Sequence, residues 1–268
     1  MQSVEVGAWP ADAAIVRAAE AVNTEGAVLL RGIVPLALVE SMRDELTRAM
    51  EEDERRFGSG YPFLGMVHAL MARGQSFLDL LAVDAVRSVS RKILGHGAIV
   101  HAFNSSSLPP HATNYAGRIH VDSPRNIPGY ATNIGLAFPL DAFTIENGAM
   151  EIWPESFRLA SAPGQDEFDA HRTILSGLMP GDAVCFNSRS WHQSGTNGTG
   201  AWRRGVTLNV CRAYMRQQFD YPRMIPPSVA EGLTEDVRQF LGYQVRMPVS
   251  MDEFLAPADQ RPYRPGQE

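Results

Sequence analysis

Cysteine is almost absent from this 268-residue sequence, which contains only Cys185 and Cys211. Neither belongs to a Cys-x-x-Cys pair, and small folds that depend on disulfides carry many more cysteines. The pattern therefore argues against a disulfide framework, and we expect two reduced thiols in the core.

Long apolar runs are missing as well. No apolar stretch reaches the roughly 18 residues that a membrane-spanning helix requires. The N-terminus, MQSVEVGAWPADAA, has no basic region followed by an apolar stretch, so it does not read as a signal peptide. These absences predict a cytoplasmic protein without a membrane span.

Lysine is scarce and no run of basic residues occurs, while the formal net charge is −6 and the pI is near 5.7. Sequence-independent binding to a phosphate backbone needs a basic face. We therefore expect a small-molecule substrate, and neither nucleic acid nor a membrane as a partner. The sequence leaves the oligomeric state open.

The composition, with 44% hydrophobic and 20% charged residues, is that of a folded chain with a substantial core. The length fits one elaborated domain. Within that single domain, 1–268, the change from helical apolar spacing to short β-rich runs predicts three parts. They are a helical N-terminal part at about 10–95, a β-rich core at about 97–216, and a C-terminal helix and tail at 217–268.

Apolar residues at helical spacing predict helices over 11–22, 35–57 and 77–95, with a short β run at 26–32. From residue 97 onward, short β-rich runs alternate with clusters of Gly, Pro, Asn and Asp, which is typical of an all-β sandwich or barrel. A last helix is predicted at 229–242. The expected fold class is mainly β with a layer of helices packed on one sheet.

The segment GRIHVDS (117–123) is the first with a chemical signature. Read as a strand, it directs His120 and Asp122 to the same side, because residues i and i+2 of a strand share a face. An imidazole beside a carboxylate supplies either two metal ligands or an acid–base pair. The His-x-Asp pattern alone is common by chance, and most histidines of a β domain are surface residues or hydrogen-bonded core residues.

A distant histidine favours the metal. His192 lies in SRSWHQSG (188–195), and two histidines with one carboxylate leave three coordination positions open. That arrangement suits non-haem Fe(II), which must bind an oxidisable co-substrate and O₂. Arg203 follows after the turn TNGTG, and a guanidinium matches a carboxylate in a fixed two-pronged geometry. The order predicts a site for a dicarboxylate, with one end on the metal and the other at Arg203.

At this point the chain resembles the phytanoyl-CoA dioxygenase (PhyH-like) family of Fe(II)/2-oxoglutarate-dependent oxygenases. The resemblance runs from about Phe103 to Tyr214, with a looser match in the helical N-terminal region. The segments that carry it are GRIHVDS, LDAFTIENGAMEIWPESF (140–157) and PGDAVCFNSRSWHQSGTNGTGAWRRGVTL (180–208). The resemblance implies a double-stranded β-helix core, of jelly-roll or cupin-like type, flanked by N-terminal helices.

Carried over position by position, the resemblance implies roles for six residues. The iron ligands would be His120, Asp122 and His192. The residues that bind the co-substrate would be Arg203, Ser194 and Asn104. The implied cofactors are Fe(II), 2-oxoglutarate and O₂, and no side-chain nucleophile is needed.

Two departures from the family pattern concern the walls of the site rather than the ligands. Ile119 and Val121 flank the first histidine where the family often has Trp and Gln, and Ala137 stands where a strand Trp often lines the pocket. The native substrate is therefore not implied by the family's name. Asp122 itself favours oxygenation over halogenation, because related halogenases have Gly or Ala in its place.

The resemblance implies that 2-oxoglutarate is decarboxylated to succinate and CO₂ while an unactivated C–H bond is oxidised, usually by hydroxylation. The same chemistry also serves epimerisation, cyclisation or desaturation, and the sequence does not choose among them. No basic patch for coenzyme A is evident, which favours a specialised metabolite, an amino acid or a similar small compound over an acyl-CoA. Candidate substrate contacts are Arg125, Asn126, Tyr61 and Trp191. Arg125 and Asn126 are explained at least as well as solvated loop residues, Tyr61 is more often a core residue, and Trp191 could equally be buried on the opposite face.

Two other classes of protein compete with this interpretation. A cupin-like metal isomerase or hydrolase would use the same histidines and carboxylate, but it would need neither Arg203 nor 2-oxoglutarate. A β-sandwich binding module would release no succinate with any substrate.

Overall fold

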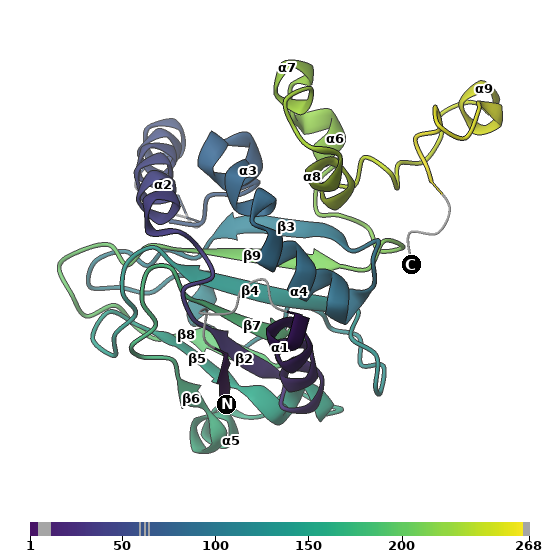
Figure 1. Cartoon of the computed structure of the whole chain (residues 1–268). Helices are drawn as coiled ribbons and strands as arrows, with labels where there is room; N and C mark the ends of the chain where they lie inside the picture. The colour runs from purple at the N-terminus through teal and green to yellow at the C-terminus, as the bar shows by residue number, and fades with distance from the viewer. Residues whose placement is uncertain (5–11, 59, 62, 64, 265–268) are drawn as a thin grey trace.

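The computed structural model describes residues 1–4, 12–58, 60, 61, 63 and 65–264. It is a mixed α/β structure in which helices cover a large β-sheet on one side and a smaller sheet lies on the other (Figure 1). The sequence-based expectation of a mainly β chain understated the helices. The expected start of the helical part, near residue 10, lies outside the described residues.

The large sheet has six strands and collects segments from most of the chain. Its first two strands are parallel to each other and its other neighbours are antiparallel. In spatial order the strands are β1 (Gln2–Val4), β2 (Ala27–Leu30), β7 (Ala183–Asn187), β4 (Asn133–Pro139), β9 (Gly205–Cys211) and β3 (Ile99–Ser105). The N-terminal part therefore contributes two strands as well as helices.

The small sheet has three antiparallel strands. In spatial order they are β6 (Thr173–Ile174), β5 (Met150–Trp153) and β8 (Trp191–Ser194). The strand that was expected over GRIHVDS is absent as a regular element. That segment is extended but pairs through one isolated antiparallel bridge only, between His120 and His192.

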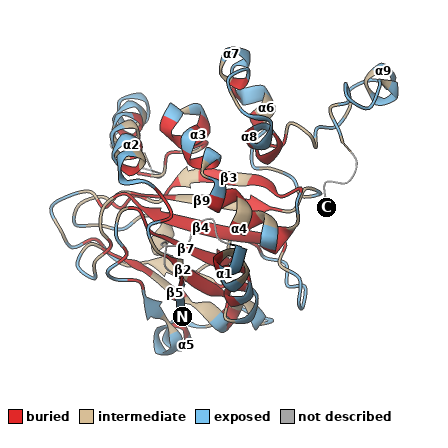
Figure 2. Ribbon diagram, in the orientation of Figure 1, coloured by how far each residue is buried: buried red, intermediate tan, exposed pale blue. Residues whose placement is uncertain are grey.

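The alternation of side chains gives the large sheet two apolar faces. Leu136 is in register with Cys185 and Leu208, and all three belong to the core cluster shared with the helices. Their strand neighbours Ala137 and Val184 belong to a second cluster, which lies between the two sheets. Figure 2 shows the resulting layers, with buried strands beneath helices that are exposed on their outer sides.

The helices on the first face are α1 (Asp12–Thr24), α2 (Leu36–Phe57), α3 (Gln75–Ala82) and α4 (Asp84–Leu94). The single helix predicted over 77–95 was wrong, because Val83 has an extended backbone with φ −65° and ψ 115° and separates α3 from α4. The helix predicted over 229–242 is likewise divided. Its second half begins where the Thr234 side chain accepts a hydrogen bond from the backbone N–H of Val237.

The remaining helical elements are short. They are η1 (Leu70–Ala72), η2 (Tyr115–Gly117), η3 (Pro154–Arg158), α5 (Gln165–His171), α6 (Tyr221–Met224), α7 (Pro227–Ala230), α8 (Glu235–Phe240) and α9 (Met251–Leu255). Across the part of the chain that the structure describes, no helix combines the length and the apolar character needed to cross a bilayer.

Candidate metal centre

The candidate metal ligands are brought together by backbone pairing. His120 and His192 each donate a backbone N–H to the other's carbonyl oxygen, and both distances are 3.0 Å. The backbone N–H groups of Asp122 and Ser123 both donate to the carbonyl of Ser188, at 2.9 and 3.0 Å. The short extended segment is thus fastened to the β7–β8 connection, which places its side chains beside His192.

Both imidazoles are oriented by a hydrogen bond to the backbone carbonyl of the residue two positions earlier. The Nδ1 of His120 lies 2.7 Å from the carbonyl oxygen of Arg118, and the Nδ1 of His192 lies 2.9 Å from that of Ser190. A carbonyl oxygen only accepts, so each Nδ1 carries the proton and each Nε2 presents a lone pair. In this tautomer Nε2 is free to bind a metal while the Nδ1–H bond to a carbonyl fixes the ring.

The two Nε2 atoms converge on one carboxylate oxygen. The Oδ1 of Asp122 lies 3.6 Å from the Nε2 of His120 and 3.7 Å from that of His192. One donor atom from each of the three residues lies within 4.8 Å of the others. The second oxygen of Asp122, Oδ2, is buried without a hydrogen-bond partner among the described residues, which is costly for a carboxylate with no cation nearby.

The protonation state of His192 also suits a ligand. Burial lowers the pKa of His192 to about 4, and the neighbouring His120 contributes in the same direction, against smaller raising effects of Asp122 and the Ser190 carbonyl. The imidazole is therefore neutral at physiological pH, and a neutral imidazole is the form that binds a metal.

These donors open into a cavity of about 310 Å³ between the two sheets. Its walls come from β3, η2, the His120 segment, β4, β5, β7, β8 and β9. The residues that line it include all six residues for which the family resemblance implies metal or co-substrate roles, namely Asn104, His120, Asp122, His192, Ser194 and Arg203.

Arg203 is the most unusual residue of the cavity. Only 2% of it is exposed, its guanidinium carbon lies 4.4 Å from the centre of the Phe143 ring, and one of its nitrogens donates to Ser194 Oγ at 3.3 Å. Burial lowers the pKa of Arg203 to about 9, and Asp141 opposes this shift. No carboxylate of the described residues forms an ion pair with Arg203, and its Nε is buried without a partner. Burial of a cation without an acidic partner is costly, and an anion in the cavity would offset that cost.

The turn that precedes Arg203 is fixed by Asn197, which is fully buried. Its side-chain amide donates to the carbonyls of Leu108, Pro109 and Ala201 at 3.4, 3.0 and 2.8 Å. Arg203 itself then exchanges two backbone hydrogen bonds with Leu108. The turn therefore holds the Arg203 backbone against the segment that follows β3.

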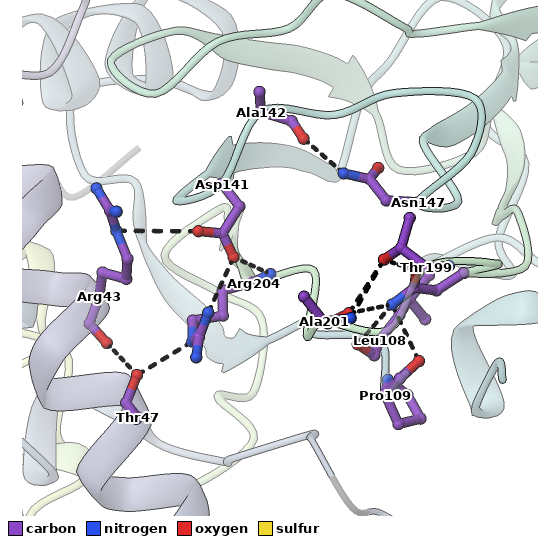
Figure 3. A network of polar contacts seen from close by, with 11 residues as sticks. Arg43, Thr47, Leu108, Pro109, Asp141, Ala142, Asn147, Thr199, Ala201 and Arg204 are labelled. Carbon is purple, nitrogen blue, oxygen red and sulfur yellow. Dashed lines mark hydrogen bonds and ion pairs between the residues drawn. The ribbon is translucent and has the colours of Figure 1, made fainter. Parts of the chain in front are cut away.

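Arg204 secures the other side of this turn (Figure 3). Its side chain pairs with Asp141 at 3.3 Å and donates to Thr47 Oγ1 at 3.0 Å, while Arg43 lies 3.9 Å from the other oxygen of Asp141. Helix α2 is thereby joined to the loop that follows β4, and Arg204 is unavailable to the cavity.

Asn104 lines the cavity, although its polar atoms are engaged elsewhere. Its side-chain oxygen accepts from the backbone N–H of Ala69 at 3.1 Å, and its amide nitrogen donates to Gln218 at 3.2 Å. Ser194 keeps its hydroxyl within reach of the Arg203 guanidinium. Ser194 therefore has a hydroxyl beside the Arg203 guanidinium, whereas the polar atoms of Asn104 are already hydrogen-bonded to other residues.

The four candidate substrate contacts do not reach this cavity. Arg125 and Asn126 border a second cavity. Tyr61 stacks on the ring of Phe57 and meets Phe63 edge to face, and Trp191 is in register with Trp153 on the neighbouring strand of the small sheet. Their assignment to the substrate remains a prediction that the geometry of this cavity does not favour.

Several lining residues were not singled out from the sequence. Thr207 and Asn209 of β9 alternate with Leu208, which packs under the helices, so their shared face was available from strand periodicity. For Tyr115 of η2 and Gln193 of β8, no periodicity in the sequence indicates that the side chain lines the cavity. Gln193 is held by a 2.8 Å hydrogen bond to Glu151.

Two histidines and one carboxylate, directed into a cavity between two β-sheets, are the arrangement of non-haem iron oxygenases. The family model described as phytanoyl-CoA dioxygenase (PhyH) matches residues 22–205. The chain belongs to this family, as the sequence resemblance predicted, and is an oxygenase enzyme.

Relatives match over nearly the whole chain. Protein Rv1501 of Mycobacterium tuberculosis is 28% identical over 259 residues, which are 92% of this chain and 94% of that protein. Dioxygenase ALT11 of Alternaria alternata is 23% identical over 249 residues, which are 84% of this chain and 80% of that protein.

Solved structures show the same fold. AviO1 from Streptomyces viridochromogenes Tue57 has a TM-score of 0.60 at 20% identity, covering 73% of this chain and 94% of that one. The non-heme alpha ketoglutarate dependent epimerase SnoN from nogalamycin biosynthesis also has a TM-score of 0.60, at 19% identity, covering 75% of this chain and 82% of that one.

Proposed function

We propose that the protein is an Fe(II)- and 2-oxoglutarate-dependent dioxygenase that hydroxylates an unactivated C–H bond of a small molecule, such as a specialised metabolite. In this proposal the chain is a single catalytic domain, and its two sheets form a double-stranded β-helix core. The observation that carries the proposal is the presence, in one cavity, of three metal donors and a buried guanidinium that no carboxylate of the described residues neutralises.

The donor set fits Fe(II). His120 and His192 present neutral Nε2 atoms, and Asp122 has a buried oxygen that lacks a partner. The Nε2 atoms of the two histidines and the carboxylate of Asp122 are all electron-rich, so their close approach is unfavourable without a cation. A divalent cation between them would form a bond to each residue and neutralise the Asp122 carboxylate. Imidazole with carboxylate is a ligand set that iron accepts, and three protein ligands leave positions for other molecules.

The cavity also fits 2-oxoglutarate. One carboxylate would be held by Arg203, whose guanidinium is fixed by Phe143 and by the turn before it, and the Ser194 hydroxyl would donate to the same group. The other end would then reach the metal donors. A dicarboxylate would give the buried Arg203 the anionic partner that it lacks.

When bound, iron would supply oxidation of a C–H bond by O₂, with 2-oxoglutarate as the reductant that leaves as succinate and CO₂. The chain's own residues supply positioning. The Arg203 turn would orient the co-substrate, and the two sheets bury His192, while His120 and Asp122 stay partly exposed at the mouth of the cavity. The remaining wall, which includes Met150, Thr207 and Asn209, would hold the reacting carbon close to the metal.

Epimerisation is a second candidate reaction. SnoN, which shares the fold, is described as an alpha ketoglutarate dependent epimerase, and this chemistry needs the same donors and the same co-substrate site. A cupin-like metal isomerase or hydrolase is less well supported, because it gives no role to the buried charge of Arg203.

Anaerobic titration tests the co-substrate. Addition of 2-oxoglutarate to the protein with Fe(II) should produce a weak visible charge-transfer band, because the keto acid would chelate the metal. A cupin-like hydrolase or a binding module would give no such band. Aerobic succinate release, even uncoupled from substrate, should then depend on both Fe(II) and 2-oxoglutarate. Metal binding without a band or succinate would contradict the proposal.

A further inference from the structure

A second cavity, of about 340 Å³, lies beside the loop that follows the candidate metal ligands. Its walls are the loop 125–132, the end of β7 with Arg189 just after it, the end of η3 and the end of α1. It shares no lining residue with the cavity of the metal centre. Three arginines from three distant parts of the chain border it, namely Arg125, Arg158 and Arg189.

None of these three arginines forms an ion pair with a carboxylate of the described residues, and no Asp or Glu lines the cavity. Other arginines of the chain, such as Arg172 and Arg204, do pair with acidic side chains. In a chain of net charge −6, three unneutralised guanidiniums around one cavity produce a local positive field.

Two of the guanidiniums are held in place by backbone carbonyls rather than by acids. Arg189 donates to the carbonyls of Pro124 and Leu159 at 3.2 and 2.7 Å, and its Nε is buried without a partner. Arg158 donates to the carbonyl of Thr24. These neutral contacts fix the side chains while leaving their charges available to a ligand.

The loop itself is anchored by a further arginine. The Arg212 guanidinium carbon lies 3.8 Å from the centre of the Tyr130 ring, and the side chain donates to the carbonyls of Ala131 and Leu94 at 2.8 and 2.9 Å. Tyr214 adds a hydrogen bond to the Tyr130 hydroxyl at 3.3 Å. The wall formed by Tyr130 is therefore fixed, and Arg212 adds positive charge behind it.

The rest of the wall is apolar. Ile127, Pro128 and Phe157 line the cavity together with Tyr130. We propose that this cavity binds a phosphate monoester, with the phosphate held by the three arginines and the organic part packed against Phe157 and Tyr130. The site is separate from the metal centre, and the inference does not rest on the proposed reaction.

A phosphate monoester is the ligand that matches both halves of the cavity. It carries close to two negative charges and three acceptor oxygens at neutral pH. Guanidinium groups meet such oxygens in paired hydrogen bonds, so several arginines serve one phosphate better than one carboxylate. Inorganic phosphate would match the charges but would leave the apolar wall without a contact.

The location also connects this cavity to the metal centre mechanically. Arg125 lies in the loop directly after Asp122 and Ser123, and Arg189 directly follows Ser188. The carbonyl of Ser188 accepts hydrogen bonds from the backbone N–H groups of Asp122 and Ser123. A phosphate that contacts Arg125 and Arg189 would join the two segments that hold the candidate ligands. Its binding should therefore raise the midpoint of thermal unfolding.

Isothermal titration calorimetry of the metal-free protein with phenyl phosphate tests the site. We expect saturable binding that weakens with added salt, at least tenfold weaker binding of benzoate, weaker binding of inorganic phosphate, and none of benzyl alcohol. Arg125→Gln and Arg158→Gln should each weaken phenyl phosphate binding about tenfold. Both side chains are exposed, so these variants should keep the native circular dichroism spectrum.

Two control variants separate this site from general electrostatics and from the co-substrate site. Arg48→Gln removes an exposed charge of α2 that lines neither cavity, and folded Arg203→Gln removes the cation of the first cavity. Both should bind phenyl phosphate as the wild type does. The inference is overturned if the wild type shows no saturable binding, if Arg125→Gln and Arg158→Gln bind normally, if either control loses binding, or if benzoate binds equally well.

Discussion

Arg203 and Arg204 are adjacent in the sequence but lie in opposite environments. Arg203 is 2% exposed, stacks on Phe143 inside the cavity and has no acidic partner among the described residues. Arg204 pairs with Asp141 outside the cavity (Figure 3). Replacing each arginine by glutamine gives two matched variants, because each variant loses one guanidinium and the two positions are adjacent.

Arg203→Gln should raise the KM for 2-oxoglutarate about ten- to a hundredfold. A hydrogen bond to a charged group contributes about 1.5–3 kcal/mol, and each 1.4 kcal/mol is about a factor of ten in affinity. Succinate release measured over a range of 2-oxoglutarate concentrations gives the value, and Fe(II) affinity should not change.

Arg204→Gln is the control for this comparison. It should leave the KM for 2-oxoglutarate within about twofold while lowering stability slightly, because a partly exposed ion pair contributes only about 0–1 kcal/mol. An equal rise of KM in both variants would mean that Arg203 acts through the fold of the turn rather than on the co-substrate.

Asp122→Ala should abolish metal binding without unfolding the protein. The wild-type carboxylate has a buried oxygen without a partner, so its removal should leave the free energy of unfolding of the metal-free protein unchanged or raise it by about 1 kcal/mol. Titration with Co(II), followed by its visible absorption, measures binding, and thermal unfolding measures stability.

The matched control for this variant is Asp44→Ala, which removes an exposed carboxylate of α2. It should bind Co(II) as the wild type does. Retained Co(II) affinity in Asp122→Ala, or a large loss of stability of the metal-free protein, would show that Asp122 is a structural residue rather than a ligand.

Gly135→Ala tests the packing behind His192. A Cβ at Gly135 would lie 2.2 Å from the Phe186 ring, and that ring is 4.9 Å from the His192 ring, centre to centre. We expect a loss of about 1–3 kcal/mol in stability from overpacking, together with weaker Co(II) binding, because Phe186 must move. Gly164→Ala, where a Cβ would meet nothing within 4 Å, should alter neither quantity.

The sequence grouped the three candidate metal ligands and Arg203 correctly in space, because the spacing that relates them is local. His-x-Asp needs only an extended backbone to direct both side chains to one side, and this held although the segment forms a single bridge instead of a strand. The position of Arg203 followed from the turn after His192. The division of the helical region at Val83 was missed, because the apolar spacing continues across it and only the backbone changes.

The arginines of the second cavity could not be grouped from the sequence pattern. Arg125, Arg158 and Arg189 are isolated in the sequence, so the chain reads as lacking a basic patch. The loop after Asp122, the end of η3 and the β7–β8 connection bring them together. Such a cluster depends on tertiary structure alone, and one sequence without its fold contains no signal for it.

Asn197→Ala tests whether the Arg203 turn positions the co-substrate. The substitution leaves the carbonyls of Leu108, Pro109 and Ala201 without their shared donor. It should lower stability by about 2–3 kcal/mol and raise the KM for 2-oxoglutarate several-fold, with Co(II) affinity unchanged. Asn147→Ala, which removes a comparable side-chain bond to the Ala142 carbonyl in a neighbouring loop (Figure 3), should lower stability alone. If both variants raise KM equally, general loosening of the loops explains the effect, whereas a rise confined to Asn197→Ala shows that this turn sets the place of the guanidinium.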